Sequence, residues 1–187
     1  MSLMLLGILN SQAAGGAAGA YDLLETVSLT SNTTSVEFTG LGAYSEYKHL
    51  QIRLVARIER SIFSDNLFLT LNSNNSNIYP YHALRGDGFS VTSTFSSGAG
   101  TEFLINCLAN SATANNYSTM VIDLLDFSST LKNTTMRYLN GKSEYGADLI
   151  ELGSGAFLDT SAITSIQIFR NTFGIMAGSR FSLYGVK

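Results

Sequence analysis

Residues 49–58 alternate between apolar and polar side chains, and this spacing restricts the fold more than any other part of the chain. One set of alternate positions is wholly apolar and consists of Leu50, Ile52, Leu54, Ala56 and Ile58. The opposite set includes Gln51, Arg53 and Arg57. A period of two is that of a β-strand, because successive side chains point to opposite faces of a sheet. The segment is therefore predicted to be a strand with one face buried.

Further short segments share this strand-like character. They comprise residues 21–30, 35–41, 67–72, 89–95, 102–108, 119–127, 134–139, 165–170 and 180–186. Clusters of Asn, Ser and Gly separate them, as at residues 72–77 and 86–88. No segment has the periodicity of a convincing amphipathic helix. About ten short strands predict an all-β fold, an antiparallel β-sandwich of the jelly-roll kind, over residues 21–187.

A chain of 187 residues with 45% hydrophobic content can bury one sizeable core, so one domain with an appendage is expected. The single cysteine, Cys107, lies in the apolar run 103–108 and is predicted to be a buried core residue. Residues 120–127 are apolar on both faces over most of their length. A strand of this kind is covered on both sides, which indicates a subunit interface or a covering loop on its outer face.

The appendage is residues 1–20, an apolar segment followed by a Gly/Ala tether. The apolar side chains are those of Leu3, Leu5, Leu6, Ile8 and Leu9, and the tether contains Gly15, Gly16 and Gly19. The segment is too short to span a bilayer, and no basic residue precedes Lys48, so neither a membrane segment nor a secretory leader is expected. We interpret it as an extended or short helical arm that docks into another protein. Each large aliphatic side chain so buried contributes about 1.5–3 kcal/mol before ordering costs, and the glycines let the arm turn.

Residues for nucleophilic or metal-dependent catalysis are sparse. The only histidines are His49 and His82, Cys107 has apolar neighbours, and no G-x-S-x-G or metal-ligand spacing occurs. Asp65 with residues 72–77 offers oxygen ligands for calcium, but such residues are also those of an ordinary hairpin loop. No catalytic residue, metal or cofactor is therefore expected.

Two sets of acidic residues offer the pair of carboxylates that a glycoside hydrolase requires. They are Asp123 with Asp126, and Glu144 with Asp148 and Glu151. The first pair lies within a predicted strand, where pairing with arginine or backbone amides is the commoner role. Nucleic acid is not an expected partner, because the formal net charge is −3 and the eleven basic residues are scattered.

Residues 78–85 form the most plausible ligand-binding segment. Tyr79, Tyr81, His82 and Arg85 lie close together there, and aromatic side chains beside polar groups are typical of glycan-binding surfaces. The chain has no Trp, and packing of these aromatic rings within the fold is the alternative. A module that binds a host receptor or surface glycan through these four residues is the second functional hypothesis.

Four phrases carry a resemblance to a known family. They are LGILNS at residues 6–11, AYDLLETV at 20–27, YKHLQIR at 47–53 and AGSRFSLYGVK at 177–187. Together they resemble structural proteins of tailed-bacteriophage virions, and the resemblance extends over nearly the whole chain. It implies a non-enzymatic β-sandwich component of a head, neck or tail. Its expected partners are other virion proteins and further copies of itself, often in threefold arrangement in phage appendages, with the arm as attachment.

Overall fold

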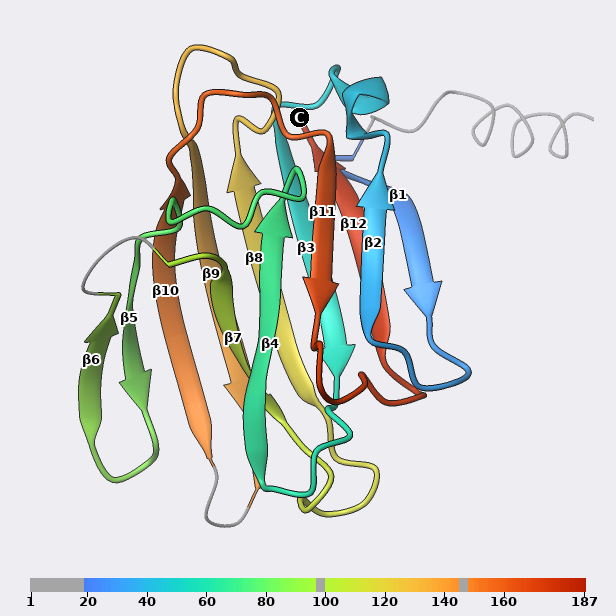
Figure 1. The fold of residues 1–187 in the computed structure, drawn as a ribbon, viewed down its shortest axis with the longest axis vertical. Coiled ribbons are helices and arrows are strands. Elements are labelled where there is room, and N and C mark those ends of the chain that lie inside the picture. Colours follow the sequence, from blue (N-terminus) through green and yellow to red (C-terminus); the bar gives the residue numbers. More distant parts are fainter. Residues whose placement is uncertain (1–18, 97–99, 145–147) are drawn as a thin grey trace, which may run out of the picture.

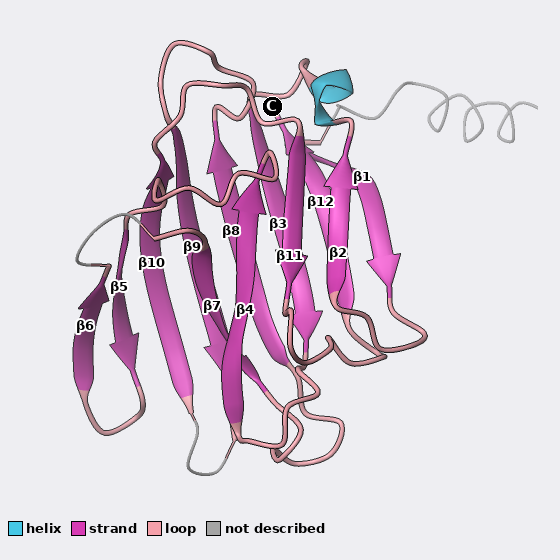
Figure 2. Ribbon diagram, viewed as in Figure 1, coloured by secondary structure: helices cyan, strands magenta, loops and turns pink. Residues whose placement is uncertain are grey.

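The structure is a computed structural model, and it describes residues 19–96, 100–144 and 148–187. Strands and loops make up nearly all of it, with one short 3-10 helix, η1 (Leu41–Tyr44) (Figure 2). The twelve strands are β1 (Tyr21–Ser28), β2 (Ser35–Thr39), β3 (His49–Ala56), β4 (Ser64–Leu71), β5 (Tyr81–Gly86), β6 (Val91–Phe95), β7 (Phe103–Leu108), β8 (Ser118–Leu125), β9 (Thr134–Lys142), β10 (Leu149–Phe157), β11 (Ser165–Phe169) and β12 (Arg180–Val186). Within the described ranges, no helix is long and apolar enough to cross a membrane.

The strands form two antiparallel sheets packed face to face (Figure 1). The larger sheet has the order β1-β12-β3-β8-β9-β10-β5-β6, and the smaller has the order β2-β11-β4-β7. Strands β1 to β4 belong in turn to the larger, smaller, larger and smaller sheet. Strands β7, β8, β11 and β12 belong in turn to the smaller, larger, smaller and larger sheet. This arrangement of eight strands is a jelly roll. The predicted antiparallel β-sandwich is confirmed.

Two hairpins, β5–β6 and β9–β10, are additional to the jelly roll. They lie side by side and lengthen the larger sheet by the order β9-β10-β5-β6, which we call the sheet extension. In Figure 1 the outer hairpin, β5–β6, lies at the left edge of the molecule, beyond the strands of the smaller sheet. The sheet extension thus reaches past the surface that the second sheet covers.

All ten segments predicted as strands overlap strands of the structure, although the bounds differ. Two strands, β5 and β10, were not predicted. Strand β10 reads Leu-Ile-Glu-Leu-Gly-Ser-Gly-Ala-Phe, and its glycines weaken any strand pattern. An ideal Cβ added to Gly153 would lie 2.2 Å from the Tyr138 ring, and one added to Gly155 would lie 2.5 Å from the Phe103 ring. The glycines are therefore needed for packing between strands, which a local pattern does not reveal.

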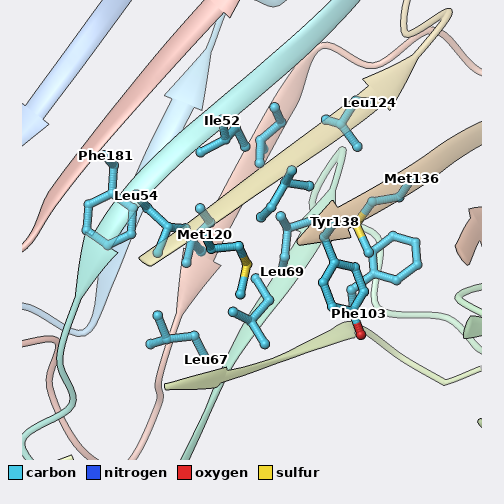
Figure 3. Packing of buried hydrophobic residues seen from close by; sticks show 14 of the residues in the cluster. Ile52, Leu54, Leu67, Leu69, Phe103, Met120, Leu124, Met136, Tyr138 and Phe181 are labelled. Carbon is cyan, nitrogen blue, oxygen red and sulfur yellow. The ribbon is translucent and has the colours of Figure 1, made fainter. Parts of the chain in front are cut away.

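The core lies between the two sheets. Figure 3 shows Ile52, Leu54, Met120, Leu124 and Phe181 of the larger sheet facing Leu67, Leu69 and Phe103 of the smaller one. All of these side chains are at most 4% exposed. In β3 the alternate residues predicted to be buried are buried, together with Ile58 just beyond the strand. The period-two reading of this segment is confirmed.

Arg57 was expected on the polar face of this segment, and that expectation is wrong. The strand ends at Ala56, and the Arg57 side chain is only 3% exposed. Its guanidinium donates hydrogen bonds to the carbonyls of Asn110, Ala112, Thr113 and Asn116 at 2.6–3.2 Å. The arginine is thus a buried anchor for the loop between β7 and β8, whose carbonyls offset the loss of water.

Cys107 is expected to resist thiol reagents in the folded protein. Its side chain is 1% exposed, and the thiol donates to the carbonyl of Ala56 at 3.1 Å. Burial raises the pKa of the thiol to about 12, so almost no reactive thiolate exists near neutral pH. Iodoacetamide labelling followed by mass spectrometry should modify Cys107 only in denaturant. If Cys107 of the folded protein were labelled completely and as fast as in denaturant, the result would contradict this packing.

Candidate interaction surface

The outer face of the sheet extension is apolar, as its strand register requires. Leu139 of β9 lies opposite Leu152 of β10, and Leu152 lies opposite Leu84 of β5. Leu84 in turn lies opposite Ser93 of β6, and neighbouring outward positions carry Ile150. Because the inward residues of these strands face the sandwich interior, this row of aliphatic side chains faces away from it.

These outward side chains are exposed to a degree unusual for their type. Leu84 is 58% exposed, Leu152 57% and Ile150 61%. Of the twelve exposed large hydrophobic side chains among the described residues, seven belong to the sheet extension or its tip: Leu84, Phe89, Val91, Phe95, Leu139, Ile150 and Leu152. Concentration on the sheet extension and its tip distinguishes this set from scattered surface hydrophobics and makes it a candidate contact surface.

Two shallow grooves lie on this face. The first, of about 450 Å³, is lined by Leu84, Phe95 and Leu152, with His82 and Arg137 among its polar members. The second, of about 340 Å³, includes Leu139 and Ile150 and continues toward β3 and β8. Val121 of β8 lines it and is half-buried. Of the outward apolar residues of β8, Val121 therefore joins the same surface.

Charged and aromatic residues occupy the rest of the outer face. Asp123 of β8 pairs with Arg137 at 2.9 Å and accepts a hydrogen bond from Gln51 at 2.7 Å. The guanidinium of Arg53 lies over the Tyr184 ring, 4.7 Å from its centre. Arg137 also borders the first groove, so the apolar surface ends at this paired charge. An apolar patch with a polar border has the anatomy of a protein interface.

The β5–β6 turn presents an aromatic side chain at the end of the sheet extension. Phe89 is 99% exposed at this turn. The turn is held by the Asp87 carboxylate, which accepts hydrogen bonds from the backbone N–H groups of Phe89 and Ser90 at 2.9 and 2.7 Å. These hydrogen bonds lower the pKa of Asp87 below its usual value. Gly88 has a φ of +88°, which glycine adopts without penalty.

The inner face of the sheet extension contains a buried ion pair. Glu151 of β10 is fully buried and lies 2.6 Å from the Nε of Arg85 on β5. The Tyr138 hydroxyl of β9 donates to the other oxygen of the same carboxylate. Burial, reinforced by this carboxylate, raises the pKa of Tyr138 far above its usual range. The three groups satisfy one another between the layers and tie β9, β10 and β5 together.

The structure does not bring Tyr79, Tyr81, His82 and Arg85 onto one surface. Successive residues of β5 point to opposite sides, so exposed His82 lies on the outer face while Arg85 lies inward, bound to Glu151. Tyr81 is partly buried against the core.

The prediction that Tyr79 belongs to an exposed ligand surface is wrong. Its side chain is fully buried, its hydroxyl donates to the carbonyl of Asn74 at 2.5 Å, and burial raises its pKa to about 12. Its ring packs edge-on against Phe103, with centres 5.0 Å apart. The alternative noted in the sequence, aromatic packing within the fold, describes this residue.

The predicted arm residues Leu3, Leu5, Leu6, Ile8 and Leu9, with Gly15 and Gly16, lie outside the described residues. Gly19 is described and is exposed two residues before β1. The docking role of the arm stays a prediction.

The acidic residues that could have formed a hydrolase pair have structural partners. Asp126 contacts Lys132 and His49, with its backbone N–H donating to His49 Nδ1 at 2.9 Å. Glu144 accepts hydrogen bonds from Thr113 and Asn116, which lower the pKa of its carboxyl group. Across the described part of the chain, no three His, Cys, Asp or Glu side chains gather as metal ligands would. Asp65, the carboxylate of the possible calcium site, pairs with Arg60 and Arg170.

Sequence reasoning missed the aliphatic residues that form the apolar surface. Leu84 and Leu152 stand in the two unpredicted strands, and Leu139 ended a predicted strand without a partner to define its face. The alternation of Ile150 and Leu152 with Glu151 and Gly153 was the available signal. It spans too few residues to indicate a strand by itself.

Comparison with known proteins gives little beyond the fold. No protein-family model matches the chain, and no curated protein matches it. Among solved structures, the Ruminococcus gnavus IT-sialidase CBM40 is similar over 87% of this chain and 93% of that chain, with a TM-score of 0.40 and 10% sequence identity. A likeness at this level says nothing about which molecule this chain binds.

Proposed function

We propose that this chain is a non-enzymatic structural subunit that docks onto another protein through the apolar outer face of the sheet extension. The observation that carries the proposal is the row formed by Leu139, Leu152 and Leu84, which is exposed although the sandwich has a complete core without it. Each of these side chains contributes about 1.5–3 kcal/mol when removed from water, before the costs of association. Such a surface favours a permanent assembly over a solitary domain.

The sequence resemblance supports the virion of a tailed bacteriophage as that assembly. The other proteins of that virion are then the partners, and residues 3–9 of the arm provide a second attachment. The partners of the acidic residues support a non-enzymatic role, because Asp123, Asp126 and Glu151 each form ion pairs within the fold. A jelly roll alone would not distinguish among these roles, since the same fold serves many functions.

The Leu152→Asp variant is expected to reduce incorporation into phage particles by at least about tenfold. Placing a carboxylate in the contact removes one aliphatic anchor and buries a charge, and about 1.4 kcal/mol already corresponds to tenfold. Copies per purified particle are measured by quantitative mass spectrometry. The matched control is Leu131→Asp, because Leu131 is 92% exposed in the loop that joins β8 to β9, where it shares a hollow with Tyr47 and Lys48 and lines neither groove of the outer face.

Thermal unfolding of both variants checks that they fold as stably as the parent chain. Normal incorporation of the Leu152→Asp variant would overturn the docking surface. The same assay with residues 2–12 deleted separates the arm from the sheet face. If that deletion leaves incorporation unchanged, the arm is not an attachment.

A further inference from the structure

Strand β6 is an open edge of the larger sheet. It pairs with β5 on one side. There the backbone N–H of Ser96 donates to the carbonyl of Tyr81 at 2.9 Å, and the backbone N–H of Asp87 donates to the carbonyl of Ser90 at 3.3 Å. Hydrogen-bonded and non-hydrogen-bonded pairs alternate in an antiparallel ladder, so the even-numbered residues of β6 bond to β5. The N–H and C=O groups of the odd-numbered residues, Val91, Ser93 and Phe95, therefore point away from the sheet.

The β6 edge lacks the features that usually prevent edge strands from pairing. Its sequence, Val-Thr-Ser-Thr-Phe, contains no charge and no proline, and its register with β5 is unbroken. Val91 is 73% exposed and Phe95 68%.

The other three sheet edges of the described structure are protected. Strand β1 carries Asp22 and Glu25 and has a register shift between Leu23 and Glu25. Strand β2 carries the charged residue Glu37. On the β7 edge, the carbonyl of Asn106 already accepts a hydrogen bond from the Asn140 side chain at 2.7 Å. Strand β7 is neutral and regular too, but all its side chains are buried or half-buried, so among these edges only β6 offers a neutral, regular strand with exposed side chains.

We propose that two copies of this chain join through β6, antiparallel, about a twofold axis at Ser93. Val91 then pairs with Phe95 of the partner subunit, and Ser93 pairs with Ser93 of the partner subunit. All the outward N–H and C=O groups of β6 bond across the axis, because each of these pairs is a hydrogen-bonded pair. The two larger sheets become one continuous sheet.

The side chains of β6 suit this register on both faces. On the outer face, Val91 meets the partner's Phe95, an aromatic and β-branched pair that stabilises antiparallel strands. On the inner face, Thr92 meets the partner's Thr94, and two threonines form a favourable cross-strand pair. The strand is nearly palindromic about Ser93, so one twofold operation satisfies both ends. Pairing β6 with the partner's β1 would instead oppose a bulged, acidic strand and would not close by twofold symmetry.

Self-association is tested with the purified full chain by analytical ultracentrifugation across a concentration series. The parent chain is expected to reach a dimer, and Ser93→Pro is expected to weaken dimerisation at least about tenfold. The proline removes an N–H that β5 does not use, so it should leave the hairpin intact. Ser93→Ala keeps the N–H and should dimerise like the parent. A parent chain that stays monomeric, or forms trimers, overturns the proposal.

Register is tested by disulfide formation between two single-cysteine substitutions. Thr92→Cys and Thr94→Cys, mixed under mild oxidation, should give a covalent heterodimer, because residues in this non-hydrogen-bonded pair lie about 4.5 Å apart at Cα. Each variant alone should stay largely uncrosslinked, since its own positions lie beyond about 7 Å. Equal crosslinking of single variants and mixture would overturn the register. These measurements use no phage particle, so their failure leaves docking through Leu152 untouched, and the converse also holds.

Discussion

Replacing Phe103 by alanine is expected to lower the free energy of unfolding by about 3–5 kcal/mol. The Phe103 side chain is fully buried and packs against the Tyr79 ring and the backbone of Gly155. It lies where β7 of the smaller sheet meets β10 of the sheet extension, so its loss leaves a cavity that neighbouring strands can fill only by moving. The measurement is urea unfolding monitored by circular dichroism.

The matched control is Phe89→Ala, which removes the same side chain from the exposed β5–β6 turn. Because Phe89 is 99% exposed, the free energy of unfolding should change by no more than about 0.5 kcal/mol. If Phe103→Ala were as stable as this control, the inner face of the sheet extension would not be packed as described.

Replacing Arg57 by methionine is expected to lower the free energy of unfolding by about 2–4 kcal/mol. Methionine can follow the apolar part of the arginine side chain but cannot donate to the carbonyls of Asn110, Ala112, Thr113 and Asn116. A buried carbonyl left without a partner costs about 1–3 kcal/mol, and some of these groups can turn to water. Hydrogen exchange should also accelerate in the β7–β8 loop, which this side chain anchors.

Arg180→Met is the control for this arginine. Arg180 lies on neighbouring strand β12 and is exposed, so its replacement should leave both stability and loop exchange nearly unchanged. Equal effects of the two substitutions would show that loss of positive charge, and not loss of the loop anchor, lowers stability.

Arg57 and the segment that contains Phe103 show which features of the fold the sequence could predict and which it could not. The apolar run 103–108 correctly predicted a strand and the burial of Cys107, because a run of apolar residues is a local pattern. The position of Arg57 four residues after Arg53, on the same side of a period-two pattern, predicted exposure, because the end of the strand at Ala56 and the loop carbonyls that receive the guanidinium are not visible locally. Arginine is rarely buried, and only its partners make the exception stable.

The candidate surfaces show the same limit. Tyr79, Tyr81, His82 and Arg85 are neighbours in sequence, yet strand alternation and burial separate them. Leu84, Leu139 and Leu152 are far apart in sequence, yet strand pairing aligns them. Which residues share a face of a sheet depends on long-range pairing, and a single strand does not specify its neighbours.

The sequence by itself determined the class of fold. Its period-two segments and turn residues are sufficient for an antiparallel sandwich, because side-chain alternation is a property of each strand taken alone. The tertiary structure alone decided that glycine-bearing β10 is a central strand, that Arg57 is an anchor and that the apolar residues of the sheet extension form one face. These features come from contacts between residues distant in the chain, whose free energies no local pattern contains.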